Sequence, residues 1–430
     1  RMKKLLALLL ALVMSLSLAA CGGSDEETPS DTTDEGSGTE ETAGIAAEDL
    51  QIGLICIHDE NSGYDLAHID GLRGACEALG IGEDQITMRI NIPESQECYD
   101  AATQLADAGC DIIFSDSYGH QSYMALAAQD YPDVTFVACT GDQAAVAGIP
   151  NLKNIFPYTY ESRYVSGVVA GVKLKEMMDN GEVTDPYIGY VGAYPYAEVV
   201  CGYTAFLLGI QSVVPEAYME VQYTNSWYDP VAEGEAANIL MADGCVIIGQ
   251  HADSTGAPAA TQKQKDAGKI CYSVGYNIDM LETAPTAALT SATNVWEVYY
   301  EYLFKSMMDG ENPATNWSEG YNEGAVAITD LGPEVAEGTA EKVAEVEAAL
   351  KDGSLHVFDT SKFTVNGETV TTAPIDLTFY DYSTGTPVAV YQGDTEEAIT
   401  DGYFSESTLR SAPYFSLRID GITEDADPVA

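Results

Sequence analysis

Basic residues are scarce in this 430-residue chain. Eighteen lysines and arginines stand against 68 aspartates and glutamates, and the formal net charge is −50 at pH 7. Because nucleic-acid binding depends on lysine and arginine contacts to phosphates, this charge excludes nucleic acid as a partner. The same charge repels anionic ligands and therefore favours a neutral or a cationic one.

The sequence also lacks the short motifs of common enzyme classes. It contains no G-x-S-x-G, no phosphate-binding G-x-x-x-x-G-K-[ST] and no H-E-x-x-H. We therefore predict a protein that binds its ligand without converting it, and that needs neither a cofactor nor a metal ion. The alternative is a hydrolase in which Asp253 and Asp279 form a pair of catalytic carboxylates, which is an unspecific signal.

Cysteines do not form a metal or redox pattern. Nine are present, and no two have the C-x-x-C spacing. Cys56, Cys139 and Cys271 stand in short apolar runs, where a free cysteine acts as a small buried hydrophobic residue. We predict no disulfide framework.

No apolar run is long enough to cross a membrane. The longest, Leu5–Leu18, spans about 14 residues, short of the roughly 20 that a spanning helix needs. It follows Lys3 and Lys4 and ends in small residues directly before Cys21, as in a lipoprotein signal; a plain secretory signal is the alternative. We predict a lipid anchor on Cys21, an acidic disordered tether over 22–49, and attachment to the extracytoplasmic face of the cell membrane.

Alternating apolar and amphipathic segments from residue 50 onward predict an α/β protein with parallel sheets. The alternation of strands and helices occurs in two similar series, and a long helix over 161–178 connects the two. Strands are expected at 51–57, 86–91, 111–115, 134–138, 187–193, 219–224, 245–249 and 270–274. Further helices are expected at 67–79, 96–108, 121–130, 198–212, 230–242, 258–267, 294–309 and 334–351.

About 300 residues exceed what one core usually holds, so we predict two lobes with a ligand cleft between them. Segments 50–157 and about 290–325 are assigned to lobe 1, and 158–289 and about 326–356 to lobe 2. Residues 357–430 alternate Thr, Val and Tyr and are expected to add short strands to the second lobe.

Polar and aromatic residues follow the ends of the predicted strands, where open parallel sheets bind their ligands. The segment 58–64 follows the first strand, 116–120 the third, and 250–254 and 275–279 follow strands of the second series. Their Gly, Tyr, Asn and Asp residues suit hydrogen bonding and aromatic stacking.

Several of these segments resemble the basic membrane protein family of purine-nucleoside-binding lipoproteins, the PnrA-like components of ABC importers. The resemblance covers roughly residues 50 to 330. It is carried by Tyr64-Asp65-Leu66-Ala67-His68, the segment 163–171, Ser226-Trp227-Tyr228-Asp229-Pro230, Gln250-His251-Ala252-Asp253-Ser254 and Gly275-Tyr276-Asn277-Ile278-Asp279-Met280. It implies the type I periplasmic-binding-protein fold and delivery of a bound purine or nucleoside to a permease powered by a separate ATPase.

The resemblance also implies a base held between one aromatic ring from each lobe, Tyr64 and Trp227. Asn277 and Asp279 match the segment that contacts the sugar, although Asp279 has the alternative role of a helix N-cap. His68 and His251 are either base-contacting or structural histidines. The full set of predicted ligand-binding residues is Tyr64, Asp65, His68, Asp116, Tyr118, Trp227, His251, Asp253, Tyr276, Asn277, Asp279 and Asn294.

The sequence departs from the family in one place. Many members have a lysine shortly after a Thr-Ser pair, whereas Thr290-Ser291 is followed here by Ala292, Thr293 and Asn294. An ammonium contact to the ligand is therefore missing, and the ligand is expected to be a purine nucleoside or a free base. A sugar, an amino acid, and a surface receptor without a transport function remain the alternatives.

Overall fold

The computed structural model describes residues 43–381 and 386–425, and its first sheet contains six strands, all parallel. Apolar β-branched residues fill most of these strands, as expected for strands buried on both faces. The order is β11-β5-β4-β3-β1-β2. The strands are β1 (Ile52–Ile55), β2 (Ile86–Arg89), β3 (Ile112–Ser115), β4 (Thr135–Ala138), β5 (Leu152–Ile155) and β11 (Asn316–Trp317).

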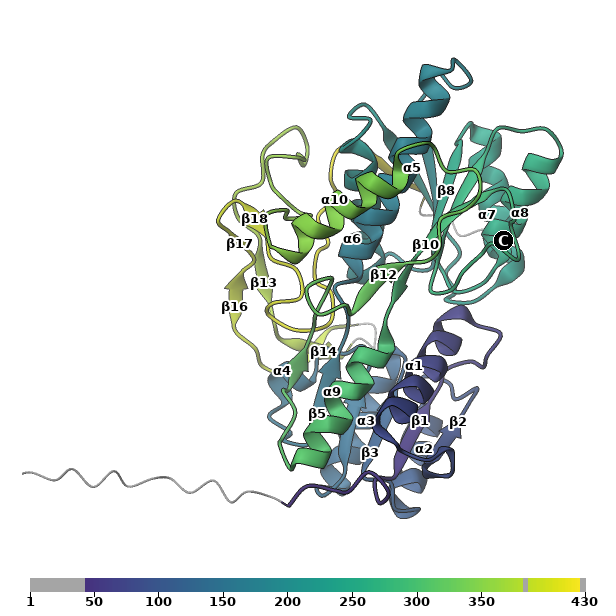
Figure 1. Ribbon diagram of the computed structural model, residues 1–430. Coiled ribbons are helices and arrows are strands. Elements are labelled where there is room, and N and C mark those ends of the chain that lie inside the picture. Colours follow the sequence, from purple (N-terminus) through teal and green to yellow (C-terminus); the bar gives the residue numbers. More distant parts are fainter. Residues whose placement is uncertain (1–42, 382–385, 426–430) are drawn as a thin grey trace, which may run out of the picture. The chain divides into compact units, whose positions relative to one another are not determined.

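Helices flank this sheet (Figure 1). α1 (Gly63–Leu79) packs against α9 (Trp296–Asp309), and α2 (Gln96–Asp107) packs against α3 (Gln121–Asp130). Three short helices, α4 (Ala144–Ala147), η1 (Glu83–Gln85) and η2 (Tyr118–His120), complete the lobe. α1 begins four residues before the predicted start, because Ser62 caps it by accepting a hydrogen bond from the Asp65 amide.

The second sheet has seven strands in the order β12-β10-β9-β8-β6-β7-β19, and only β12 is antiparallel to its neighbour. Its strands are β6 (Tyr187–Gly192), β7 (Tyr218–Tyr223), β8 (Ile247–His251), β9 (Tyr272–Tyr276), β10 (Ala288–Asn294), β12 (Val326–Ile328) and β19 (Ile422–Asp425). Its helices are α5 (Thr159–Asp179), α6 (Ala197–Gln211), α7 (Pro230–Asp243), α8 (Gly256–Asp266) and α10 (Thr339–Lys351). The predicted α/β class with two lobes is confirmed.

The connecting helix α5 packs closely against α6. A Cβ atom at Gly167 would lie 2.2 Å from the carbonyl oxygen of Phe206, and one at Gly209 would lie 2.1 Å from that of Tyr164. Only glycine lets the two backbones approach this closely.

The chain passes between the lobes three times. It leaves the first sheet after β5, returns after β10 to form α9, and passes again to the second sheet between β11 and β12. The helix expected at 294 begins at Trp296, because Asn294 is the last residue of β10. Three crossings of this kind allow two lobes to hinge about one region.

The C-terminal segment contacts both lobes, whereas the sequence led us to expect strands added to the second lobe alone. β19 extends the second sheet beside β7, but the Ser411 amide donates to Asn316 Oδ1 on β11 at 3.4 Å. The other strands of this segment pair among themselves as β13 (Pro374–Asp376) with β16 (Thr395–Glu397), β14 (Phe379–Asp381) with β15 (Val388–Tyr391), and β17 (Ile399–Thr400) with β18 (Tyr403–Phe404).

The folded region starts earlier than the predicted tether boundary. Ile45 and Ala47 pack against the core of the first lobe, and the Ile45 amide donates to Met307 O at 3.1 Å. Cys21, the signal and residues 22–42 lie outside the described residues. Among the helices within the described ranges, none combines the length and the apolarity of a membrane span.

Candidate ligand-binding site

Side chains at the carboxyl ends of both sheets surround one cavity. About 370 Å³ of empty space, part of it open to solvent, lies between them. The first lobe contributes Ile57, Tyr64, Asp116, Ser117, Tyr118 and Thr140, and the second contributes Glu198, Trp227, Asp253 and Tyr276. Six of the twelve predicted binding residues therefore lie together at this cavity: Tyr64, Asp116, Tyr118, Trp227, Asp253 and Tyr276.

Four aromatic rings line the cavity, and three of them, Tyr64, Trp227 and Tyr276, are held in place from behind. The Tyr64 hydroxyl donates to Cys139 O at 3.3 Å, and the Trp227 ring meets Tyr194 edge to face with centroids 5.3 Å apart. The Arg163 guanidinium carbon lies 3.8 Å from the centroid of the Tyr276 ring. Rings supported in this way can stack on a flat ligand with little loss of side-chain entropy.

Three carboxyl groups face the same space: those of Asp116 and Asp253 are buried, and that of Glu198 is largely buried. Burial raises the pKa of Asp253 well above its ordinary value, and the nearby charges of Asp65 and Glu233 add to this effect. Burial likewise raises the pKa of Glu198 to about 7, against the opposing charge of Arg163. Both groups can therefore become neutral near physiological pH, unless a ligand supplies donors to the carboxylates.

Asp65 lies next to Asp116 but does not itself line the cavity. Burial opposes ionisation of Asp65, but hydrogen bonds from His58 and Ser62 outweigh it and lower its pKa. Burial and the charge of Asp65 raise the pKa of Asp116, although its Oδ1 accepts from the Ile57 amide at 2.9 Å. We assign one proton to the pair and place it on Asp116.

Cys56 completes a cluster with this pair, since one ligand atom from each of the three residues lies within 4.8 Å of the others. Burial raises the pKa of the Cys56 thiol well above its ordinary value, and the neighbouring carboxyl pair of Asp116 and Asp65 adds to this. A metal-binding cysteine must be a thiolate, so the surroundings disfavour a metal ion here.

The two predicted histidines lie behind the cavity rather than in its wall. His68 Nδ1 is 2.8 Å from the Tyr300 hydroxyl, its ring stacks on Trp296, and burial lowers its pKa to about 3. His251 Nε2 lies 3.2 Å from Glu198 Oε1. Neither histidine lines the cavity, and His251 contacts a carboxyl group that does.

Three further predicted residues also lie outside the wall. Asn277 donates to Asp253 Oδ1 at 3.1 Å, and Asn294 Nδ2 donates to the Tyr276 hydroxyl at 3.4 Å, so each positions a lining residue. Asp279 is exposed, and its Oδ1 accepts from the Leu281 amide at 2.6 Å. No helix follows Asp279, so this hydrogen bond closes a turn and is not the helix N-cap that was the alternative to ligand binding.

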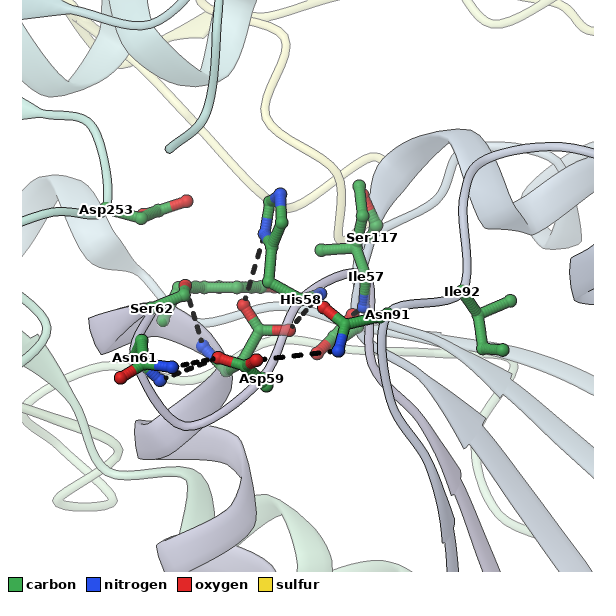
Figure 2. A network of polar contacts seen from close by, with 12 residues as sticks. Ile57, His58, Asp59, Asn61, Ser62, Asn91, Ile92, Ser117 and Asp253 are labelled. Atoms are coloured by element: carbon green, nitrogen blue, oxygen red, sulfur yellow. Dashed lines mark hydrogen bonds and ion pairs between the residues drawn. The ribbon is translucent and has the colours of Figure 1, made fainter. Parts of the chain in front are cut away.

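A network of hydrogen bonds holds the loop between β1 and α1. Asp59 Oδ1 accepts from the backbone and side-chain nitrogens of Asn61, and Asn91 Nδ2 lies 3.5 Å from Asp59 Oδ2 (Figure 2). The Gly63 amide donates across the lobes to Asp253 O at 3.0 Å. This contact joins the start of α1 to the loop that carries Asp253.

Sequence reasoning missed four of the ten lining residues, namely Ile57, Ser117, Thr140 and Glu198. Thr140 lies two residues after the end of β4, and Glu198 lies in the first turn of α6, after β6. Thr140 and Glu198 both obey the strand-end rule that found the predicted lining residues. Neither stands in a motif with a recognisable composition, so only the rule applied to every strand would have found them.

The family model described as ABC transporter substrate-binding protein PnrA-like matches residues 46–355. The chain belongs to this family. PnrA-like proteins are substrate-binding components of transporters, so the chain is a binding protein of an ABC transporter. The match ends before the segment that contains β13 to β19.

Two relatives and one solved structure illustrate the similarity. A purine-binding protein of Brucella abortus is 33% identical over 317 residues, which covers 74% of this chain and 85% of the relative. A Haloferax volcanii protein whose name assigns it to glucose binding in an ABC transporter is 31% identical, covering 70% of this chain and 72% of the relative. The structure of an ABC transporter solute-binding protein from Aeropyrum pernix aligns with a TM-score of 0.61 at 15% identity, over 72% of this chain and 93% of that one.

Proposed function

We propose that this PnrA-like protein captures a purine, as a free base or a nucleoside, and delivers it to an ABC permease. The observation that carries the proposal is the convergence of Tyr64 and Trp227, from opposite lobes, on one cavity with buried carboxyl groups. A purine offers two flat faces for the rings and several donors and acceptors at its edge. Each stacked ring contributes about 1 to 3 kcal/mol to binding.

The carboxyl groups suit the edge of a neutral base. Asp253 and Glu198 accept hydrogen bonds from ring or amino N–H groups when ionised, and donate to ring nitrogens when protonated. Hydrogen bonds to an ionised group contribute roughly 1.5 to 3 kcal/mol each. The purine-binding relative, at 33% identity, supports the same ligand class.

The cavity disfavours an amino acid. Binding a free amino acid calls for a cation opposite its carboxylate, and none of the ten lining residues is a lysine or an arginine. Arg163 is near, but it lies against the Tyr276 ring and donates to Gln250 O. A sugar is the second candidate, because rings and carboxylates also bind hexoses and because one relative is named for glucose.

Capture requires the lobes to move. The cavity is narrow in this arrangement, and residues of both lobes line it. We infer that the open and closed states interconvert about the three crossings, and that a bound purine favours the closed state by contacting both lobes at once. The permease would then recognise the closed protein, held at the membrane by lipid on Cys21.

Calorimetric titration of the purified protein with adenine, adenosine, guanosine, inosine, glucose and leucine tests the proposal. We expect micromolar or tighter binding of at least one purine, and recovery of that purine unchanged. Binding of glucose alone would reject the purine and leave the transport role intact. Release of a free base from a nucleoside would instead support a hydrolase.

The lipid anchor needs a separate test. Cells that express the full chain are fed a labelled fatty acid. Incorporation of the label into the full chain but not into a Cys21→Ser variant would support the lipid anchor.

A further inference from the structure

The segment after residue 355, where the match to the PnrA-like family ends, is anchored in the second lobe. β19 pairs with β7, and Glu424 Oε1 on β19 accepts from the Tyr203 and Tyr223 hydroxyls at 3.0 and 2.6 Å. Phe415 is fully buried in the apolar core of the same lobe. Because a packed core transmits movement, this segment moves together with the second lobe.

One loop of the segment, residues 406–415, is held in shape by its own hydrogen bonds. The buried Glu406 carboxyl group accepts from the amides of Tyr414 and Phe415 at 3.0 and 2.6 Å, which closes the base of the loop. The Tyr414 hydroxyl accepts from two further amides of the loop at 3.1 and 3.2 Å. A loop braced in this way holds Arg410, at its tip, in one position with little further loss of entropy.

The tip of this loop contacts the first lobe. Arg410 Nη1 lies 3.4 Å from Oδ2 of Asp142, which follows β4, and the two side chains are only 13% and 12% exposed. The Ser411 amide donates to Asn316 Oδ1 on β11 at 3.4 Å. Within the described ranges, no residue of the segment belongs to the apolar clusters of the first lobe. The segment is therefore joined to the second lobe by packing and to the first by polar contacts that can break.

Asp142 connects this contact with the ligand cavity. The Tyr118 hydroxyl donates to Asp142 Oδ2 at 3.1 Å, and this is the oxygen that faces Arg410. Tyr118 lines the cavity between the lobes. One carboxylate oxygen thus links the C-terminal segment to a first-lobe residue in the cavity wall.

We propose that the Arg410 loop, residues 406–415, is a latch that holds the lobes in the arrangement in which both line the cavity. Since the loop moves with the second lobe, the lobes cannot separate at Asp142 without breaking the ion pair. A pair largely shielded from water is little screened, so it favours the closed state before any ligand binds. The latch lies outside the family match, and it does not depend on which ligand the protein binds.

Distances between two spin labels test the latch without a ligand. The labels are attached after Glu97→Cys in the first turn of α2 and Val231→Cys in the first turn of α7, in a Cys21→Ser chain. Both positions are exposed and follow the carboxyl ends of strands in opposite lobes. The cysteines within the described part of the chain are all buried, so the introduced ones react selectively. We expect Arg410→Ala to lengthen and broaden the distance distribution in double electron–electron resonance.

Arg418→Ala is the matched control. Arg418 also forms an ion pair in the C-terminal segment, with its Nε 2.7 Å from Glu424 Oε2, but both partners belong to the part that is fixed to the second lobe. Its removal should leave the distances unchanged. Asp142→Ala should open the lobes as Arg410→Ala does, and the double variant should open them no further, because the two residues act through one contact.

Adenine is the probe for the effect on binding. Its affinity should fall about threefold or more in the Arg410→Ala protein, because fewer molecules are closed before it binds. Unchanged distances in a folded Arg410→Ala protein, or an equal change in Arg418→Ala, would overturn the latch. Failure of the unaltered protein to bind any purine would reject the proposed function but not the latch, which the distances test alone.

Discussion

Asp253 and Asp279 both follow neighbouring strands of the second sheet, yet their side chains have different surroundings. Asp253 is buried at the cavity and accepts from Asn277, whereas Asp279 is exposed and caps its own loop. Asp253→Asn should weaken purine binding by about tenfold or more, because an amide replaces a carboxylate that meets a donor. Asp279→Asn is the control and should leave the affinity unchanged. Equal effects in calorimetric titrations would contradict this assignment.

Trp227 offers a second test on the scale of one residue. Its ring is half-buried and lines the cavity between the lobes. Trp227→Ala should weaken binding of a free purine base more than tenfold, since a stacked ring contributes about 1 to 3 kcal/mol. Trp317→Ala, a change of another half-buried tryptophan that lies on β11, should preserve the affinity. An unchanged affinity in a folded Trp227→Ala protein would reject the stacked arrangement.

Single positions show how far residue types alone predict a site. Tyr64, Asp116 and Asp253 follow strand ends in polar, glycine-containing segments, and all three line the cavity. His68 satisfies an equally attractive pattern, but stacking on Trp296 and contact with Tyr300 remove it from the wall. Those partners are more than 200 positions away in the sequence, so no local signal distinguishes a ligand-binding histidine from a structural one.

Individual strands also differ in how well their local sequence predicts them. Strands with short apolar runs, such as β1 and β3, are predictable, whereas β5 has the sequence Leu-Lys-Asn-Ile and β10 is mostly small and polar. Their strand state comes from pairing with β4 and β9, which a local pattern does not encode. β19 joins β7 across about 200 residues of chain, and the sequence carries no sign of that partner.

The contact between α5 and α6 provides a test on the scale of elements. Gly167→Ala should lower the free energy of unfolding by about 1 to 3 kcal/mol, because the new methyl group overlaps the Phe206 carbonyl and the helices must separate. Gly234→Ala in α7 is the control, since a Cβ there has ordinary contacts at 3.4 Å or more. It should be neutral or stabilising by up to about 1 kcal/mol. Urea denaturation of both variants gives the comparison, and equal destabilisation would contradict it.

In the molecule as a whole, the two lobes are joined by the three crossings of the chain, and the C-terminal segment contacts both of them. The lobe plan could be predicted from the repeated βα pattern, but the contact of the C-terminal segment with both lobes could not. Arg410 reaches Asp142, and Ser411 reaches Asn316, through pairs separated by about 270 and 95 positions.

Buried glutamates make the stability of the whole molecule dependent on pH. Burial raises the pKa of Glu161, Glu198, Glu233 and Glu406 to about 7, from an ordinary value of 4.5. The folded state therefore binds more protons than the unfolded state between these values, and stability falls as the pH rises from about 5 to 8. Each group contributes on the order of 1 to 3 kcal/mol to this fall.

Denaturant titrations at pH 5, 6, 7 and 8 measure this dependence directly. The free energy of unfolding should be highest near pH 5, and Glu198→Gln should reduce its fall, because glutamine carries no charge to be buried at pH 8. The net charge of −50 acts in the same direction, since self-repulsion grows as carboxyl groups ionise. Added salt should therefore stabilise the protein more at pH 8 than at pH 5, since it screens this repulsion. A stability maximum at pH 8 would show that these glutamates remain charged at no cost in the folded protein.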